Sequence, residues 1–208
     1  MRNDQMSDIL VREIVRKSIH LSGLLILIIY HFTDRSTVVF WLSLIVVAMF
    51  LTEWMRLKGY IRYPGFLLRP FEEHKVAGYI YSTTSALFVI ALFPKNVAMA
   101  AISMAIIGDL SSGIAGAIMG DRANVRQMKL PHKPVLILII MFLMSFISAF
   151  LIVDLTGVDQ LPIIALVAGA AGATIADGVP WEIRGRVLDD NLTIPFTSAI
   201  LILLFSLV

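Results

Sequence analysis

The chain has 208 residues, of which 58% are hydrophobic and only 15% are charged, and its mean hydropathy is +0.86. A soluble domain would carry about one quarter charged residues, so the composition predicts an integral membrane protein. The net charge of +2 is too small to indicate a nucleic-acid partner, and the absence of cysteine excludes disulfides and thiolate metal sites. The length predicts a single membrane-embedded domain over residues 1–208.

Seven apolar segments predict an all-α, polytopic membrane helix bundle with about seven transmembrane helices. They cover residues 18–32, 37–51, 78–93, 97–120, 135–153, 161–179 and 192–208. Several are shorter than the ~20 residues that span a bilayer upright, so we expect their helices to extend into flanking residues. No small-residue cleavage site ends the first segment, which indicates a retained helix and not a signal peptide.

Lysine and arginine alternate between successive connections. The N-terminus and the second, fourth and sixth connections hold fifteen of them, whereas the first, third and fifth hold only Arg35 and Lys95. The positive-inside rule therefore predicts a cytoplasmic N-terminus and an outside C-terminus. Most of the acids and histidines near helix ends fall on the cytoplasmic side, which favours a pocket for a phosphate-bearing ligand with a divalent metal. Basic loops that only set the topology would explain the cations but not the acids.

The first polar motif leads into the first apolar segment. Glu13, Arg16, Lys17 and His20 recur at spacings of three and four, so they share one face of a helix. The two basic residues suit an interfacial anchor, whereas Glu13 and His20 on the same stripe suit a binding site. The sequence leaves both interpretations open.

A second polar motif precedes the third segment. Glu72, Glu73 and His74 stand together, and the helix that follows begins with tyrosines, serines and threonines. A solvated loop and an interfacial aromatic belt explain most of this pattern and are favoured over a metal cluster. Glu73 is retained as a candidate for orienting a substrate.

The stretch 105–122 is the centre of the prediction. Asp109 lies inside its apolar run, and Gly113, Gly116 and Gly120 follow. A carboxylate at membrane depth costs on the order of 2.5–3.5 kcal/mol on insertion scales, so it usually faces a polar cavity and has a function. A small-residue packing seam would explain the glycines but not Asp109. We therefore favour a polar site over packing alone, and the seam could serve folding or dimerisation.

A basic loop follows this helix and carries Arg122, Lys129 and Lys133. Asp109 could bind Mg²⁺ that bridges nucleotide phosphates, while these cations neutralise phosphate charge. The loop is not a P-loop, because no Gly-Lys-Ser/Thr follows a strand.

The last segment opens with Asp189, Asp190 and Asn191, and Pro195 is expected in the first turn of its helix. Asp190 or Asn191 could be a simple N-cap. Capping needs one such residue and not three, so the group is also a candidate metal and substrate site.

Taken in order, these motifs resemble the CTP-dependent polyprenol kinase family, which contains dolichol kinase, phytol kinase and CTP-using diacylglycerol kinase. Its E-x-x-R-K-x-x-H element is matched by Glu13, Arg16, Lys17 and His20. Its G-D-x-x-A-x-x-x-G-x-x-x-G element is matched by Gly108, Asp109, Gly116 and Gly120, with Ser112 in place of alanine. Its D-D-N-L-T-x-P element is matched by Asp189 through Pro195, and the acid before it corresponds to Asp177.

The resemblance implies a Mg²⁺-dependent lipid kinase that transfers the γ-phosphoryl group of CTP to a membrane isoprenoid alcohol at the cytoplasmic face. The expected catalytic residues are Asp109, Asp190 and Lys133, and the expected metal ligands are Asp109, Asp189 and Asp190. Nucleotide or phosphate binding is expected at Gly108, Gly113, Gly116, Gly120, Arg122, Lys129, Arg16 and Lys17. Substrate orientation is expected from Glu13, His20, Glu73, Asp177 and Asn191.

Three matters stay open on the sequence. After the glycine helix the family has a K-S/T-x-E-G element, whereas residues 129–134 read KLPHKP, so the choice between CTP and ATP is not fixed. A cytidylyltransferase that makes a CDP-lipid is the alternative enzyme, although its acid-rich signature is absent. A membrane transporter is the third class, since glycine-broken segments with a buried acid also suit transport.

Overall fold

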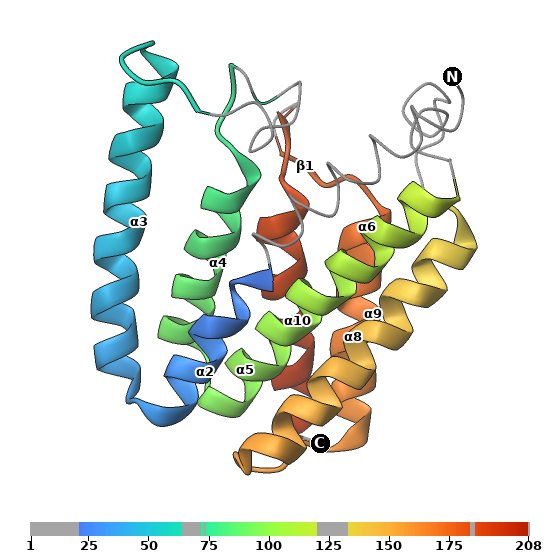
Figure 1. Ribbon diagram of the computed structural model, residues 1–208. Helices are drawn as coiled ribbons and strands as arrows, with labels where there is room; N and C mark the ends of the chain where they lie inside the picture. The colour runs from blue at the N-terminus through green and yellow to red at the C-terminus, as the bar shows by residue number, and fades with distance from the viewer. Residues whose placement is uncertain (1–20, 64–71, 73, 120–132, 184–185, 208) are drawn as a thin grey trace.

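A computed structural model describes residues 21–63, 72, 74–119, 133–183 and 186–207, and it confirms the all-α prediction apart from one hairpin of two-residue strands (Figure 1). The elements are α2 (Leu24–Phe32), α3 (Arg35–Leu57), α4 (Gly78–Leu92), α5 (Lys95–Ser103), the π-helix η2 (Met104–Gly108), α6 (Asp109–Ile118), α8 (Val135–Thr156), α9 (Ile163–Gly178), β1 (Glu182–Ile183), β2 (Arg186–Val187) and α10 (Asp190–Ser206). Because α5, η2 and α6 are continuous, the described part of the chain holds seven helical stretches, one for each predicted apolar segment.

Three of these stretches are long and apolar enough to cross a membrane. They are α3, the continuous helix from Lys95 to Ile118, and α8. Helices α4, α9 and α10 are apolar but have 10–17 residues. Seven complete spans and their orientation therefore remain a prediction.

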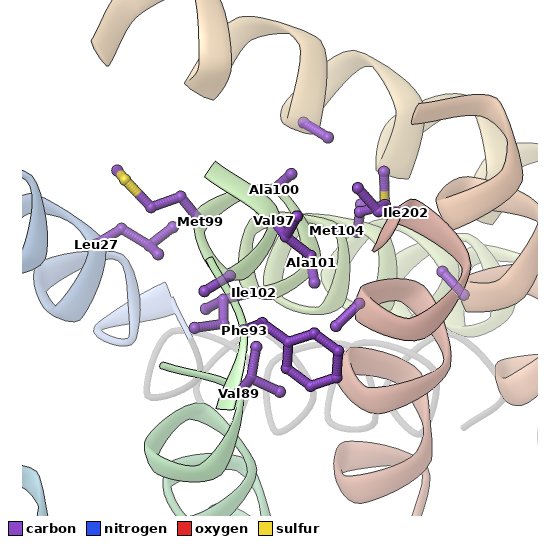
Figure 2. Packing of buried hydrophobic residues seen from close by; sticks show 14 of the residues in the cluster. Leu27, Val89, Phe93, Val97, Met99, Ala100, Ala101, Ile102, Met104 and Ile202 are labelled. Atoms are coloured by element: carbon purple, nitrogen blue, oxygen red, sulfur yellow. The ribbon is translucent and has the colours of Figure 1, made fainter. Parts of the chain in front are cut away.

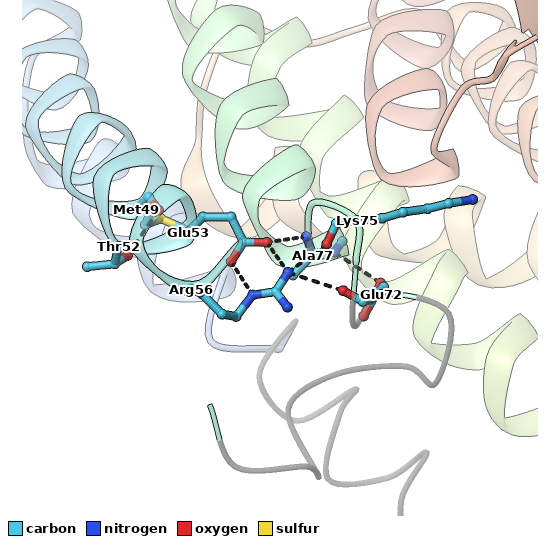
Figure 3. A network of polar contacts seen from close by, with 8 residues as sticks. Met49, Thr52, Glu53, Arg56, Glu72, Lys75 and Ala77 are labelled. Atoms are coloured by element: carbon cyan, nitrogen blue, oxygen red, sulfur yellow. Dashed lines mark hydrogen bonds and ion pairs between the residues drawn. The ribbon is translucent and has the colours of Figure 1, made fainter. Parts of the chain in front are cut away.

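Helix α3 continues six residues beyond the predicted boundary at residue 51, because its last turns carry a buried ion pair. Glu53 Oε2 accepts from Arg56 Nε at 2.9 Å, and Glu53 Oε1 accepts from Arg56 Nη2 at 2.7 Å (Figure 3). The guanidinium also donates to the carbonyls of Glu72 and Lys75, at 3.1 and 2.6 Å, and Ala77 N donates to Glu53 at 2.8 Å. This network holds the described residues just before α4 against the C-terminal end of α3.

The helix that carries Asp109 runs through the core of the bundle. Residues Val97 to Ile102 on α5 are buried in succession, and small alanines among them let neighbouring helices approach closely (Figure 2). Around them pack Leu27 of α2, Val89 of α4 and Ile202 of α10, together with Phe93, which follows the last residue of α4. Because helix association in a membrane depends on such packing, the core holds the following turn of the helix in a fixed position.

Helices α9 and α10 lie close together because α9 carries glycines at their interface. A Cβ at Gly169 would collide with Ile202, and one at Gly172 would collide with Leu201 and approach the carbonyl oxygen of Thr197 to 3.2 Å. The two helices are joined through the β1–β2 hairpin, in which Glu182 pairs with Val187. The end of α9 and the start of α10 therefore meet at the same end of the bundle.

At the opposite end of the bundle lie Arg35 and Lys95, the two basic residues that fall outside the predicted cytoplasmic connections. Lys95 Nζ donates to the carbonyls of His31 and Thr33, at 3.0 and 3.2 Å, where α2 ends. Arg35 Nη2 donates to the carbonyl of Phe93 at 2.7 Å, where α4 ends. Cations at helix C-termini satisfy carbonyls that have no partner within the helix, so both residues have a structural role.

Candidate functional site

Three carboxylates from three different helices meet at one end of the bundle. Asp109 begins α6, Asp177 lies in the last turn of α9, and Asp190 begins α10. One oxygen from each lies within 4.8 Å of the others. Asp109 and Asp177 are buried and Asp190 is half-buried. Such a separation allows three carboxylates to share one cation.

Lys133, just before α8, forms an ion pair with this cluster. Its Nζ lies 2.5 Å from Asp177 Oδ1, and the Asp177 side chain is fully buried. Burial alone would lower the pKa of Lys133, but the carboxylates of Asp177, Asp190 and Asp109 together raise this pKa above its usual value. Lys133 therefore remains a cation beside the three acids.

The second oxygen of Asp177 points to a missing partner. Asp177 Oδ2 is buried and has no hydrogen-bond partner among the described residues. A buried carboxylate oxygen normally has one, because leaving it bare costs about 1–3 kcal/mol or more for a charged group. With all three carboxylates ionised and Lys133 protonated, these four side chains would together carry a charge of −2. A divalent cation would satisfy the oxygen and balance the charge.

The backbone directly before Asp109 is a π-helix, which the sequence analysis did not predict. Residues Met104–Gly108 form this π-helical segment, and single π turns inside α-helices frequently occur at functional sites. A Cβ at Gly108 would collide with Ser145 and Met141, so α8 packs directly against the helix here. Ser145 Oγ also donates to the Met104 carbonyl at 3.3 Å. These contacts fix the position of Asp109 relative to α8.

Asp189 and Asn191 organise the start of α10. Asp189 is the N-cap, and its Oδ1 accepts from Asn191 N at 3.0 Å and from Asn191 Nδ2 at 2.6 Å. A Cβ at Gly78 would approach Asn191 Nδ2 to 3.0 Å, so the start of α4 lies against this amide. The cap is therefore Asp189 and not Asp190 or Asn191, the two residues expected from the sequence. Asp189 is not among the three clustered acids, while its neighbour Asp190 is.

Pro195 lies inside α10, beyond the first turn, so the prediction that it fits the first turn is wrong. The helix begins at Asp190, and a proline at this depth leaves the carbonyl of Asn191 without its usual N–H donor. Ser85 Oγ on α4 donates to that carbonyl at 2.9 Å. The hydroxyl of Ser85 therefore replaces the missing backbone donor and joins α4 to α10 beside the cluster.

A cavity of about 270 Å³ borders Asp109. Asp109 and Asn191 line it together with hydroxyl residues of α4, among them Ser82 and Ser85. The remaining wall is mostly apolar and comes from α2, α3, α5, η2 and α10: Ile26, Leu42, Ile45, Met49, Ile102 and Ile106 are among its residues. Asp109 thus belongs both to the carboxylate cluster and to this cavity.

The structure brings together five of the predicted residues: Asp109, Asp177, Asp190, Lys133 and Asn191 lie at or beside the cluster. Gly108, Gly113 and Gly116 are buried on the same helix. Outside the described residues lie Glu13, Arg16, Lys17, His20, Glu73, Gly120, Arg122 and Lys129.

Asp177 has a more central position than its predicted role of substrate orientation implies. It is the one charged residue of α9, and a lone carboxylate in an otherwise uncharged helix was the signal available in the sequence. Glu53 and Arg56 were not predicted as partners, although their spacing of three residues in an apolar helix would have indicated an ion pair.

No protein-family model, no curated protein and no solved structure matches the chain. The case for a function therefore depends on the geometry of the cluster and the cavity, together with the sequence motifs.

Proposed function

We propose that the chain is a multi-pass membrane lipid kinase, which transfers the γ-phosphoryl group of CTP to the hydroxyl of a membrane isoprenoid alcohol or a related lipid. One observation carries the proposal: Asp109 joins a cluster of three carboxylates to a mostly apolar cavity. The first feature suits phosphate chemistry with a metal, and the second suits a lipid. The motif resemblance supplies CTP as the donor.

The outer surface of the bundle supports a membrane setting. Helices α3 and α8 turn large apolar side chains outward, including Phe40, Trp41, Leu136 and Leu143, each about half exposed or more. Contiguous apolar surface of this kind is rare on soluble monomers and is normal against lipid.

The carboxylates fit Mg²⁺, a hard cation that prefers oxygen ligands. Asp109, Asp177 and Asp190 would hold it, with the bare Asp177 Oδ2 among the ligand atoms. When bound, the ion would neutralise charge on the nucleotide phosphates. Asp189 stays a predicted ligand, but one of its oxygens already accepts two bonds from Asn191.

The reaction forms one P–O bond and breaks another. The alcohol oxygen attacks the γ-phosphorus of CTP, the bond from that phosphorus to the β–γ bridging oxygen breaks, and its electron pair leaves on CDP. The hydroxyl proton passes to a carboxylate and then to water. Asp109 is the best-placed acceptor, because it borders the cavity in which the alcohol would lie.

Lys133 would neutralise charge on the transferred phosphoryl group. Its raised pKa keeps it cationic, and its Nζ already lies against the carboxylates. Charge neutralisation and positioning supply most of the rate in phosphoryl transfer, so Lys133 belongs to the catalytic set.

The test is phosphotransfer by purified protein in detergent with Mg²⁺, with γ-labelled CTP and ATP offered in parallel. Label that moves from CTP to an isoprenoid alcohol supports the proposal. If α-labelled CTP instead yields a CDP-lipid from an acidic phospholipid, the protein is a cytidylyltransferase. If neither reaction occurs with well-folded protein, the kinase proposal fails and transport becomes the function to test.

A further inference from the structure

Glu72 is a buried carboxylate that the proposed reaction does not use. The sequence favours a solvated loop for the motif of Glu72, Glu73 and His74, and His74 is exposed as expected. Glu72, however, is only 4% exposed. Burying a carboxylate costs free energy unless it is hydrogen-bonded, so the position of Glu72 points to a specific task.

Helix α4 begins without a capping side chain, because its N-cap is Ala77. The N–H groups at the start of a helix have no partner within it, and alanine cannot supply one. Two buried carboxylates from other segments take this role. Glu53 Oε1 accepts from Ala77 N at 2.8 Å (Figure 3). Glu72 Oε1 accepts from Gly78 N at 3.1 Å, so its carboxylate helps to fix where α4 begins.

The start of α4 that Glu72 caps lies against Asn191 of α10. A Cβ at Gly78 would lie 3.3 Å from Glu72 Oε1 and 3.0 Å from Asn191 Nδ2, so the carboxylate and the amide both lie on the Cβ side of Gly78. Further along α4, Ser85 Oγ donates to the Asn191 carbonyl at 2.9 Å. Helix α4 therefore contacts Asn191 both at its amide and at its carbonyl.

Asn191 directly follows Asp190, the half-buried acid of the cluster. Asn191 N donates to Asp190 Oδ1 at 3.0 Å, which ties the orientation of this carboxylate to the backbone of Asn191. Glu72 itself is not among the three clustered acids, so its effect on them must pass through α4 and Asn191.

We propose that Glu72 is a positioning residue for the carboxylate cluster: by fixing the start of α4 against Asn191, it holds the first turn of α10 and keeps Asp190 in the cluster. The relevance of this positioning to catalysis rests on the proposed kinase function, whereas the positioning itself is a property of the fold. Without the carboxylate, the start of α4 frays and Asn191 loses its contact with Gly78. Asp190 then no longer has a fixed place beside the other two acids.

Hydrogen exchange followed by mass spectrometry, with the protein in detergent, measures this coupling directly. Glu72→Ala should speed exchange by about tenfold or more both at residues 78–81 of α4 and at residues 190–194 of α10, because a buried acceptor is lost. Glu72→Gln keeps an oxygen that can accept from Gly78 N, so it should restore most of the protection. Residues 96–102 of α5 report on the core of the bundle and should not change.

The matched control is Glu182→Ala, because Glu182 is an exposed glutamate on β1, in the hairpin that leads into α10. It should leave exchange in α4 and α10 unchanged. In an Asn191→Ala background, Glu72→Ala should still speed exchange in α4 but should add clearly less in α10, because the amide contact is gone. Faster exchange confined to α4, an equal rise at residues 96–102, or an undiminished effect on α10 in the Asn191→Ala background would each overturn the inference.

Phosphotransfer from γ-labelled CTP separates this inference from the proposed function. With an active wild type, Glu72→Ala should lower kcat by about tenfold while KM for CTP changes little, because a displaced carboxylate misplaces the reacting groups. Glu72→Gln should recover most of the rate. Wild-type kcat in a Glu72→Ala variant whose α10 exchange has risen would refute the catalytic relevance of the positioning. A wild type that transfers no phosphate would refute the kinase proposal and leave the exchange result to decide the positioning.

Discussion

Lys133 Nζ lies 2.5 Å from Asp177 Oδ1, which joins the residue before α8 to the last turn of α9. The pair is a direct contact between a cation and the carboxylate cluster. Within Asp177, Oδ1 is paired with Lys133, whereas Oδ2 has no hydrogen-bond partner among the described residues. Cation binding and phosphate binding can therefore be tested separately.

Lys133→Met is expected to lower kcat by about 100-fold or more, because it removes a cation that would face the transferred phosphoryl group. Mn²⁺ affinity, measured by electron paramagnetic resonance, should be retained or increased, since the carboxylates lose a competing positive charge. Lys133→Arg should recover part of the activity. Mn²⁺ binding that weakens in Lys133→Met as strongly as in Asp177→Asn would contradict this assignment.

The same pair gives a pH prediction. Because the folded-state pKa of Lys133 is raised above its ordinary value of 10.5, its contribution to stability is complete below that value and is lost as pH rises through the raised pKa. The difference in unfolding temperature between wild type and Lys133→Met should therefore stay constant between about pH 8 and pH 10. A difference that shrinks steadily over this interval would show that the ammonium titrates earlier.

Asp177→Asn and Asp189→Asn separate metal binding from helix capping. Asp177→Asn should weaken Mn²⁺ binding by at least about tenfold, because it removes a charged ligand with a bare oxygen. Asp189→Asn should change it little, since asparagine is as good an N-cap as aspartate and α10 is preserved. Equal loss of Mn²⁺ affinity in both variants would make Asp189 a ligand, as the sequence analysis expected.

The hydrogen bond from Ser85 to the Asn191 carbonyl should depend on Pro195. Ser85→Ala is expected to destabilise the fold by about 1 kcal/mol, because the carbonyl loses its donor in a buried setting. In a Pro195→Ala background the backbone N–H of residue 195 can donate instead, so the same change should cost less. A double-mutant cycle of unfolding free energies measures this coupling, and strictly additive costs would rule the explanation out.

Arg56→Met should destabilise the protein by about 3–5 kcal/mol, because Glu53 would be left buried without its counter-ion. Arg62→Met is the matched control, since Arg62 is exposed and should cost less than about 1 kcal/mol. Unfolding in detergent, followed by circular dichroism, compares the two. Similar values for both variants would show that the Glu53–Arg56 network does not hold the approach to α4.

Much of the helical pattern was predictable because apolar runs are a local signal. Each of the seven predicted segments contains a helix, and the boundary of α3 was missed because a Glu–Arg pair three residues apart can be buried once it is neutralised. Asp109 and Asp190 were recognised as unusual for the same local reason, since charge within or beside apolar sequence stands out.

The meeting of α6, α9 and α10 could not be predicted, because it depends on contacts between distant segments. Gly169 and Gly172 let α9 pack closely against α10, because neither residue has a Cβ that would collide with it. This close packing brings Asp177 on α9 near Asp190 on α10. The π-helix before Asp109 likewise occurs where Gly108 packs against Ser145 and Met141. Neither relationship has a signature within one segment.

The most direct test of the account is transfer of label from γ-labelled CTP to undecaprenol by wild-type protein and by Asp109→Asn, in detergent with Mg²⁺. Asparagine keeps the size of the side chain but removes both the charged ligand and the proton acceptor. We predict transfer by the wild type and a loss of about 1,000-fold or more in the variant, whose unfolding temperature should be at least as high as that of the wild type because a buried charge has been removed. Full transfer by folded Asp109→Asn would contradict the account.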